Sequence, residues 1–218
     1  MDVKERRDLI EYGLKIVSEG LTFSSGGNLS VYLPKDEAFL ITPSGMDYTK
    51  IKERDMVKMD LQGNLVEGER VPSSEWHMHK EIYLMRKDIK ALIHTHSRYI
   101  SVLSSLGLDL VAVNYLMASA GVSRIPIAPY ETFGTEELAK LAAQYLGDSS
   151  KAVILSNHGL IAGGETLKEA LEITRDLEFC AFQYITALST GKEIQVIPDE
   201  KMEEVMKRAK SYGQPKRK

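Results

Sequence analysis

Residues 91–96, with the sequence Ala-Leu-Ile-His-Thr-His, form a short and largely apolar stretch that predicts a buried β-strand. Its two histidines, His94 and His96, are separated by one residue. Side chains at positions i and i+2 of a strand point to the same face, about 6.6 Å apart along it. Two imidazoles at that separation can each reach one metal ion at roughly 2.0–2.1 Å. The stretch therefore indicates a two-point metal chelate, and two ordinary polar residues at a strand end are the alternative.

A third histidine, His158, lies 62 residues after His96, in the turn Asn157-His158-Gly159 that follows an apolar stretch at 151–155. Turns after strands often carry functional residues on a rigid scaffold. Three neutral imidazoles and one open position make up a catalytic zinc site. Spacing alone does not bring His158 to the other two histidines, and an exposed turn histidine is the alternative.

The remaining histidines, His77 and His79, also form a His-x-His pair, but on a predicted helix that Ser73 or Ser74 can cap. Positions i and i+2 of a helix do not face each other. We therefore expect solvent or packing roles for both. Glu75 stands at the start of the same helix, where a glutamate favours the helix dipole. A carboxylate directed at a metal ion is an equally good interpretation of Glu75.

Composition limits the class of protein. The chain has 218 residues, with 28 Lys and Arg against 31 Asp and Glu and a net charge of −3. Nucleic-acid and membrane-surface proteins usually show a basic field, so neither partner is expected. The sequence contains no apolar run that approaches the 18 residues of a membrane helix. With a single cysteine, Cys180, an intrachain disulfide is excluded, and we expect one cytoplasmic domain over residues 1–218.

Helix and strand patterns are interspersed along the chain. The first helix has Ile10, Leu14 and Val17 at helical spacing, and a series of hairpin-like strands follows it. Further helices and strands come after Ser73, including a helix that Ser97 can cap. These patterns predict an α/β fold with a mostly antiparallel sheet covered by helices.

Loops of small residues are a further feature of the sequence that can serve a binding site. Residues 26–28 (Gly-Gly-Asn) and 43–45 (Pro-Ser-Gly) bring backbone amides to a surface with little steric obstruction, and Ser73 and Ser74 add hydroxyls at a helix start. Such donors can hold a phosphate, although each loop can equally be a plain turn. The sequence lacks the dinucleotide, P-loop and Gly-x-Ser-x-Gly patterns.

Six motifs occur in order along the chain: Gly26-Gly27-Asn28-Leu29-Ser30, Thr42-Pro43-Ser44-Gly45, Pro72-Ser73-Ser74-Glu75-Trp76, His94-Thr95-His96, Ala128-Pro129-Tyr130 with Thr132-Phe133-Gly134-Thr135, and Asn157-His158-Gly159-Leu160. Together they resemble the zinc-dependent class II aldolase/epimerase family over nearly the whole chain. The resemblance implies a three-layer α/β/α fold around a mixed, mostly antiparallel sheet. It also implies a homotetramer with active sites at the subunit interfaces.

The resemblance further implies the residues of the site. Zinc would be held by His94, His96 and His158, with Glu75 as the fourth ligand when substrate is absent. The residues that would surround the substrate phosphate are Gly27, Asn28, Ser44, Gly45, Ser73 and Ser74.

Four more residues match positions that complete the site in this family, namely Ser25, Tyr115, Phe133 and Tyr212. Tyr115 matches a tyrosine that reaches the zinc of a neighbouring subunit. One departure concerns the C-terminal segment, where Ala209 occupies a position that carries an aromatic residue in the fuculose phosphate branch of the family. This difference bears on how the tail closes over the aldehyde.

The implied reaction is reversible retro-aldol cleavage of a ketose 1-phosphate. L-fuculose 1-phosphate, which would give dihydroxyacetone phosphate and L-lactaldehyde, is the first candidate substrate. Glu75 would move a proton at the dihydroxyacetone phosphate carbon, and Tyr115 would move one at the aldehyde oxygen.

Three alternatives remain open at this stage. An L-ribulose-5-phosphate 4-epimerase is the first, although epimerases of the family usually carry aspartate at the position of Glu75. A dehydratase of a methylthio-sugar phosphate is the second. A non-catalytic scaffold is the third, because the adducin head resembles this family, but that head lacks the zinc ligands that are present here.

Overall fold

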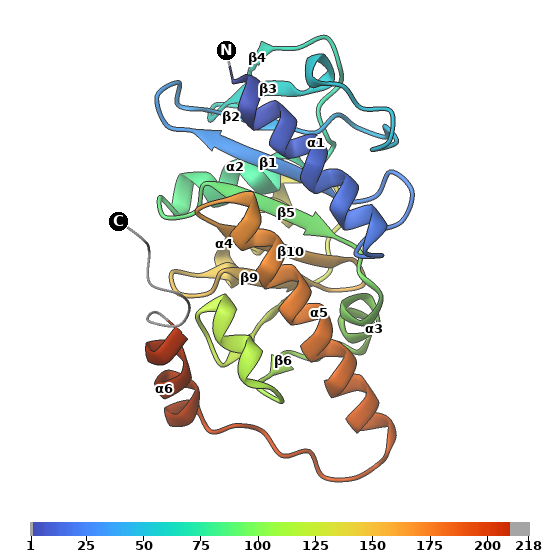
Figure 1. The fold of residues 1–218 in the computed structure, drawn as a ribbon, viewed down its shortest axis with the longest axis vertical. Helices are drawn as coiled ribbons and strands as arrows, with labels where there is room; N and C mark the ends of the chain where they lie inside the picture. The colour runs from blue at the N-terminus through green and yellow to red at the C-terminus, as the bar shows by residue number, and fades with distance from the viewer. Residues whose placement is uncertain (1, 210–218) are drawn as a thin grey trace, which may run out of the picture.

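The computed structural model describes residues 2–209 and has an eight-stranded sheet at its centre (Figure 1). The strand order is β4-β3-β2-β1-β5-β10-β9-β8. The strands are β1 (Asn28–Leu33), β2 (Ala38–Ile41), β3 (Val57–Asp60), β4 (Leu65–Glu67), β5 (Ala91–Thr95), β8 (Ile127–Ala128), β9 (Ala152–Leu155) and β10 (Gly159–Gly164). Only β8 and β9 pair in parallel within this sheet as described. Two short strands, β6 (Leu110–Val111) and β7 (Arg124–Ile125), form a separate ribbon.

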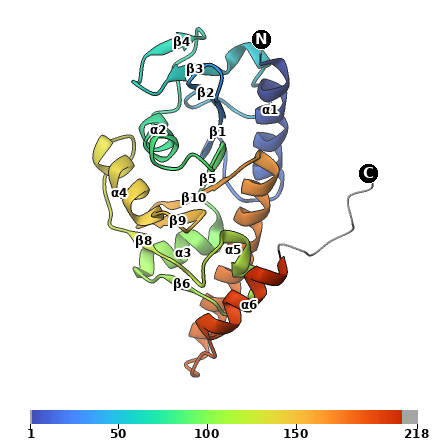
Figure 2. The ribbon, with the colours of Figure 1, turned by 90° about the vertical axis from the view of Figure 1, so that its left-hand side faces the viewer.

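Helices cover both faces of the sheet, so the structure has three layers (Figure 2). One face carries α2 (Trp76–Met85) and α4 (Glu136–Leu146), and the other carries α1 (Val3–Ser18) and α5 (Leu167–Ser189). The other helical segments are η1 (Glu53–Asp55), α3 (Arg98–Leu106), η2 (Tyr115–Ala120) and α6 (Asp199–Ala209). The predicted three-layer, mostly antiparallel α/β fold is thus confirmed. No helix within residues 2–209 is long and apolar enough to cross a membrane.

The central strand β5 is buried on both of its faces. Leu92 packs with the core under α2 and α4, whereas Ile93 packs with the core under α1 and α5. Such two-sided burial explains why the strand is an unbroken apolar run in the sequence rather than an alternating one. His94 follows Leu92 by two residues, so it points to the face covered by α2. The sequence predicted the strand correctly, and β5 ends at Thr95, one residue before His96.

The first helix is present, but its buried face differs from the predicted one. Leu9, Gly13 and Ile16 are buried, while Leu14 is 39% exposed. A Cβ atom on Gly13 would lie 2.3 Å from the ring of Tyr48. The bare glycine backbone therefore lets the aromatic ring pack against the helix on the side that also carries Leu9 and Ile16.

The helix α3 is capped in a different way from the prediction. The Ser97 side chain caps no amide and instead donates to the Glu178 carboxylate of α5, at 2.6 Å. Glu178 also accepts from the backbone amides of Tyr99 and Ile100. A carboxylate from another helix thus takes over the cap and ties the segment after His96 to α5.

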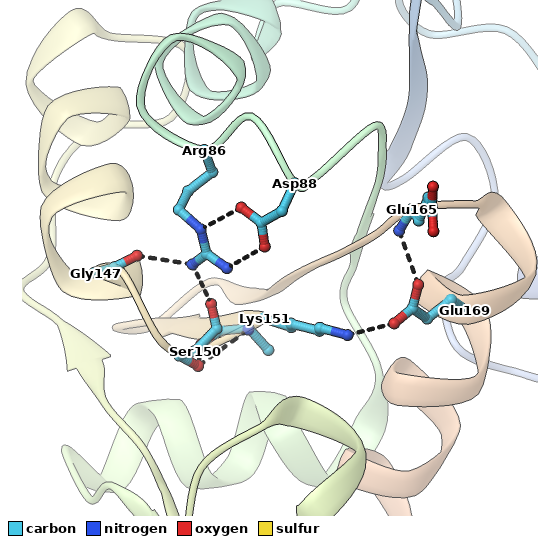
Figure 3. A network of polar contacts seen from close by, with 8 residues as sticks. Arg86, Asp88, Gly147, Ser150, Lys151, Glu165 and Glu169 are labelled. Atoms are coloured by element: carbon cyan, nitrogen blue, oxygen red, sulfur yellow. Dashed lines mark hydrogen bonds and ion pairs between the residues drawn. The ribbon is translucent and has the colours of Figure 1, made fainter. Parts of the chain in front are cut away.

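A polar network anchored by Arg86 joins the ends of three elements (Figure 3). The Arg86 guanidinium donates to the carbonyl oxygens of Gly147 at 2.8 Å and Ser150 at 2.7 Å, and it forms a bidentate pair with Asp88. Because Arg86 directly follows α2 and Gly147 directly follows α4, the network fixes both helices beside the start of β9.

We expect Arg86→Met to lower the free energy of unfolding by about 2 kcal/mol, because two carbonyl oxygens lose their donor in a poorly hydrated place. Urea unfolding followed by circular dichroism measures the change. The matched control is Arg124→Met, since the Arg124 side chain is 65% exposed and forms only a surface pair with Asp109. The control is expected to change stability by less than about 0.5 kcal/mol. Equal effects of the two substitutions would contradict the importance of the network.

Candidate active site

Four side chains from three regions of the sequence converge at one end of β5. They are Glu75, His94, His96 and His158, and each offers a ligand atom within 4.8 Å of the others. His94 is on β5 and His96 directly follows it, while His158 lies in the turn between β9 and β10. Glu75 directly precedes α2. The structure therefore brings together all four metal ligands that were proposed from the sequence.

The imidazoles direct their Nε2 atoms into this cluster. His94 Nδ1 lies 2.9 Å from the carbonyl oxygen of Leu160 on β10, and a carbonyl oxygen can only accept a hydrogen bond. His94 therefore carries a proton on Nδ1, which leaves Nε2 available as a ligand atom when the ring is neutral. His94 Nε2 lies 2.9 Å from His96 Nε2 and 3.2 Å from Oε2 of Glu75. His158 Nε2 lies 3.3 Å from the other oxygen.

The Glu75 carboxylate fits a metal site. Its side chain is buried, and Oε2 accepts a hydrogen bond from Asn28 Nδ2 at 2.8 Å. Oε1 is also buried and has no hydrogen-bond donor among residues 2–209. A buried carboxylate oxygen without a donor is costly unless a cation faces it. Three imidazoles and one carboxylate are a donor set for a divalent transition metal, so these residues fit the zinc ion that the sequence resemblance implies.

The charge states of the cluster favour metal binding. Burial by itself would raise the pKa of Glu75, but the facing His94 and His158 and the Asn28 amide hold that pKa well below its ordinary value. Glu75 is therefore ionised. Burial, reinforced by the charge of His94, lowers the pKa of His96 to about 3 and that of His158 to about 4. Both rings are neutral near pH 7, which is the form that ligates a metal.

His94 behaves differently from the other two histidines. Burial opposes its protonation, but the adjacent Glu75 carboxylate outweighs burial and raises the pKa of His94. A proton on His94 Nε2 would compete with a metal ion for the same atom.

A cavity of about 380 Å³ opens beside the cluster. The residues proposed from the sequence that line it are Ser25, Gly27, Asn28, Ser44, Gly45, Ser73, Ser74, Glu75, His96, Phe133 and His158. Tyr130, Glu131 and Asn157 also line it and had no predicted role. Among the described residues around this cavity there is no lysine or arginine. An anion here would therefore be held by amides, hydroxyls and a metal ion.

The small-residue loops are fixed by close backbone contacts. Gly27 has a φ of +70°, and a Cβ atom on it would lie 2.5 Å from the carbonyl oxygen of His94. Glycine is therefore required there. Tyr48 donates a hydrogen bond to the Gly27 carbonyl oxygen at 3.1 Å. The amides of Ser44 and Ser73 donate to the carbonyl oxygens of Val71 and Thr42, respectively. The Ser73 hydroxyl accepts from the Glu75 amide at 3.3 Å, so its own O–H can still donate to a ligand.

Among the described residues of the predicted site, His94 belongs to the ligand cluster without lining this cavity, and Tyr115 belongs to neither. Tyr115, at the start of η2, is 60% exposed and lines a different pocket together with Asp176 of α5 and Ala209 of α6. Tyr212 lies outside the described residues. Within one chain, the structure therefore does not bring Tyr115 to the metal cluster.

Sequence reasoning missed the role of His79. This residue is fully buried, with Nε2 at 2.6 Å from Asn28 Oδ1 and Nδ1 at 2.6 Å from Ser30 Oγ. His77, in contrast, is partly exposed and stacks on the Trp76 ring. A signal was present in the sequence, because His79 and Tyr83 are four residues apart on the face of α2 that also carries Met78 and Ile82.

Comparisons with known proteins agree with this geometry. Residues 7–185 match the family described as Class II Aldolase and Adducin N-terminal domain. The 5-deoxy-D-ribulose 1-phosphate aldolase of Bacillus thuringiensis serovar kurstaki is 45% identical over 211 residues, which cover 97% of this chain and 98% of that protein. The L-fuculose phosphate aldolase of Escherichia coli K12 is 37% identical over 210 residues, 96% of each chain. A solved structure of an L-fuculose 1-phosphate aldolase is 46% identical, with a TM-score of 0.90 and coverage of 94% of this chain and 95% of that one.

We expect the purified protein to bind one divalent metal ion per chain, because a single cluster of donors converges beside the cavity. His158→Ala is expected to weaken the affinity by more than about 100-fold, since it removes a ligand outright. Competition with a chromophoric chelator and elemental analysis measure both quantities. His77→Ala is the matched control and is expected to leave affinity and stoichiometry unchanged. Loss of metal in the control, or unchanged affinity in His158→Ala, would contradict the assignment.

Proposed function

The chain belongs to the class II aldolase family, and on this premise we propose that it reversibly cleaves the C3–C4 bond of a ketose 1-phosphate. The products are dihydroxyacetone phosphate and a short aldehyde. The observation that carries the proposal is Glu75, a buried carboxylate that clusters with three histidines and has one donor-free oxygen, beside a cavity of sugar-phosphate size.

The substrate class follows from the names of the relatives. One relative is a 5-deoxy-D-ribulose 1-phosphate aldolase, and others are L-fuculose phosphate aldolases. Both sugars are deoxyketoses whose far end is a methyl group. We infer a methyl-terminated deoxyketose 1-phosphate as substrate. L-fuculose 1-phosphate would yield L-lactaldehyde, as the sequence predicts, and 5-deoxy-D-ribulose 1-phosphate would yield acetaldehyde.

The phosphate is placed on the side of the cavity that the small-residue loops form. Hydroxyls of Ser44, Ser73 and Ser74 and free backbone amides around Gly27 and Gly45 are its proposed donors. These groups neutralise no charge, but oriented N–H and O–H dipoles bind phosphates well. A phosphate held there would orient the C3–C4 bond towards the histidine cluster.

Zinc is the proposed resident ion, held by His94, His96 and His158 with Glu75. When bound, the ion supplies Lewis-acid stabilisation of the negative charge that develops on the substrate as the carbon–carbon bond breaks. Glu75 is the proposed base that exchanges a proton at C3 of dihydroxyacetone phosphate, because it is the carboxylate of the ligand cluster and is ionised. Phe133 and Ser25 line the remaining wall of the cavity.

Tyr115 is the proposed acid for the aldehyde oxygen, and it would act on a neighbouring subunit. Its side chain is exposed and outside the cavity of its own chain, which suits a residue that completes a site across an interface. We therefore propose a homotetramer of single-domain chains. We also keep the cytoplasmic location that the sequence predicts as a proposal. Light scattering that gave a monomeric mass for the active protein would contradict this placement.

We expect the zinc-loaded protein to release dihydroxyacetone phosphate from L-fuculose 1-phosphate, from 5-deoxy-D-ribulose 1-phosphate or from both. Reduction of the released product by glycerol-3-phosphate dehydrogenase, with loss of NADH absorbance, measures the rate. L-ribulose 5-phosphate in the same panel tests the epimerase alternative. Formation of a C4-inverted pentulose phosphate without free aldehyde would overturn the aldolase proposal, and so would the absence of release from every deoxyketose 1-phosphate.

We expect Glu75→Gln to lower kcat by about 10²–10⁴-fold, because the substitution removes the proposed base. KM for the sugar phosphate should change little, since the proposed phosphate donors are hydroxyls and backbone amides and do not include the Glu75 carboxylate. Steady-state kinetics at saturating zinc separates the two parameters. Glu193→Gln, at an exposed position in the segment before α6, is the matched control. Full activity of Glu75→Gln would remove Glu75 from the chemistry.

A further inference from the structure

A series of buried polar side chains runs from Glu75 into the layer between α2 and the sheet. Asn28 Nδ2 lies 2.8 Å from Glu75 Oε2, and Asn28 Oδ1 lies 2.6 Å from His79 Nε2. On the far side of the ring, His79 Nδ1 lies 2.6 Å from Ser30 Oγ, which lies 2.6 Å from the Tyr83 hydroxyl. All five side chains are buried, with His79 and Ser30 at 0% exposure.

The chemistry of these groups fixes the direction of every hydrogen bond in the series. An ionised Glu75 can only accept, so Asn28 must present its amide N–H to Glu75 and its carbonyl oxygen to His79. That carbonyl oxygen also only accepts, so His79 must carry a proton on Nε2. Burial lowers the pKa of His79 to about 3, so the ring is neutral and Nδ1 accepts from Ser30. Burial raises the pKa of Tyr83, whose protonated hydroxyl completes the series by donating to Ser30.

We propose that His79 is a positioning residue, which holds the Asn28 amide in the one orientation that donates to Glu75. The proposal rests on the proposed function, because it assigns His79 a part in presenting the carboxylate to the metal ion and to substrate. Asn28 can present either its N–H or its oxygen to Glu75, since the two ends of the amide have nearly the same shape. The Glu75 carboxylate favours the N–H end, and a donor at the position of His79 Nε2 holds the amide in that same orientation from its other side.

Packing alone does not account for a histidine here. Replacing both partners of a buried hydrogen bond by apolar groups of the same shape can be nearly neutral for stability. Packing of α2 against β1 therefore does not require a series of five buried polar side chains. The end of the series at Glu75 is informative. Asn28 supplies a donor to Glu75 Oε2, whereas Oε1 has no donor and lies 3.3 Å from His158 Nε2.

Two conservative variants separate positioning from packing. His79→Gln places an N–H close to the position of Nε2 and should keep the bond to Asn28. His79→Asn is shorter, so it can bond only to Ser30 and should lose the bond to Asn28. We expect kcat of His79→Asn to fall about 10–100-fold with KM changed less than about threefold, and kcat of His79→Gln to stay within about threefold of the wild type. His77→Asn is the matched control on the same helix and is expected to leave kcat unchanged.

Affinity for zinc is a second readout that does not depend on catalysis. We expect His79→Asn to weaken zinc binding about tenfold, because Glu75 is a proposed ligand, and His79→Gln to bind zinc within about threefold of the wild type. Chelator competition measures both. If the wild type binds zinc but releases no dihydroxyacetone phosphate, the proposed function fails, and this comparison still decides the role of His79.

A double-variant cycle tests whether His79 acts through Asn28. In an Asn28→Ala background, a further His79→Asn change should alter zinc affinity less than twofold, because the bond between the two side chains is already gone. Thermal unfolding of every variant reports whether it is folded. The proposal is overturned if His79→Asn keeps wild-type kcat and zinc affinity, if His79→Gln loses as much as His79→Asn, or if the effects of Asn28→Ala and His79→Asn add independently.

Discussion

The site depends on the register in which β5 pairs with the strands on either side. His94 stands opposite Asn28 of β1 and opposite Ile161 of β10. Because side chains alternate along a strand, a slip of one residue would turn His94 and Leu92 to the other face of the sheet. The hydrogen bond from His94 to the Leu160 carbonyl oxygen and the approach of Gly27 to the His94 carbonyl oxygen exist only in this register. Strand pairing therefore sets both the ligand geometry and the position of the glycine loop.

Burial then determines how these groups behave. The buried carboxylate of Glu75 is poorly hydrated, so its negative charge must be balanced by nearby groups. Two imidazoles and the Asn28 amide lie against it, and the oxygen without a donor leaves a position for a cation. The rest of the cavity has a different character, with hydroxyls and amides in place of charged side chains. The near-neutral net charge of the chain agrees with this arrangement, since no lysine or arginine lines the cavity within residues 2–209.

Features that depend on local sequence pattern were predictable. The His94–His96 pair follows from the period of a strand, and Thr135 and Thr166 cap α4 and α5 with their side chains. Features that depend on packing between distant elements were not. His79 meets Asn28 across 51 residues of sequence, and Ser97 meets Glu178 across 81. The role of Glu75 was only partly predictable. A glutamate in the first turn of a helix has an ordinary role there, and only the contact between Glu75 and His94 of β5 shows that its carboxylate points to the histidines.

The walls of the cavity differ in how freely they can change. A Cβ atom on Gly159, beside the ligand turn, would lie 2.2 Å from the carbonyl oxygen of Thr95, so the backbone around His158 admits no larger residue. Tyr130 and Phe133 on the opposite wall are 61% and 67% exposed, and their side chains can be exchanged at little cost in packing. Substitutions are therefore tolerated more readily at Tyr130 and Phe133 than beside the ligand turn, so the cavity can change its shape there while the arrangement of the histidine cluster stays constant.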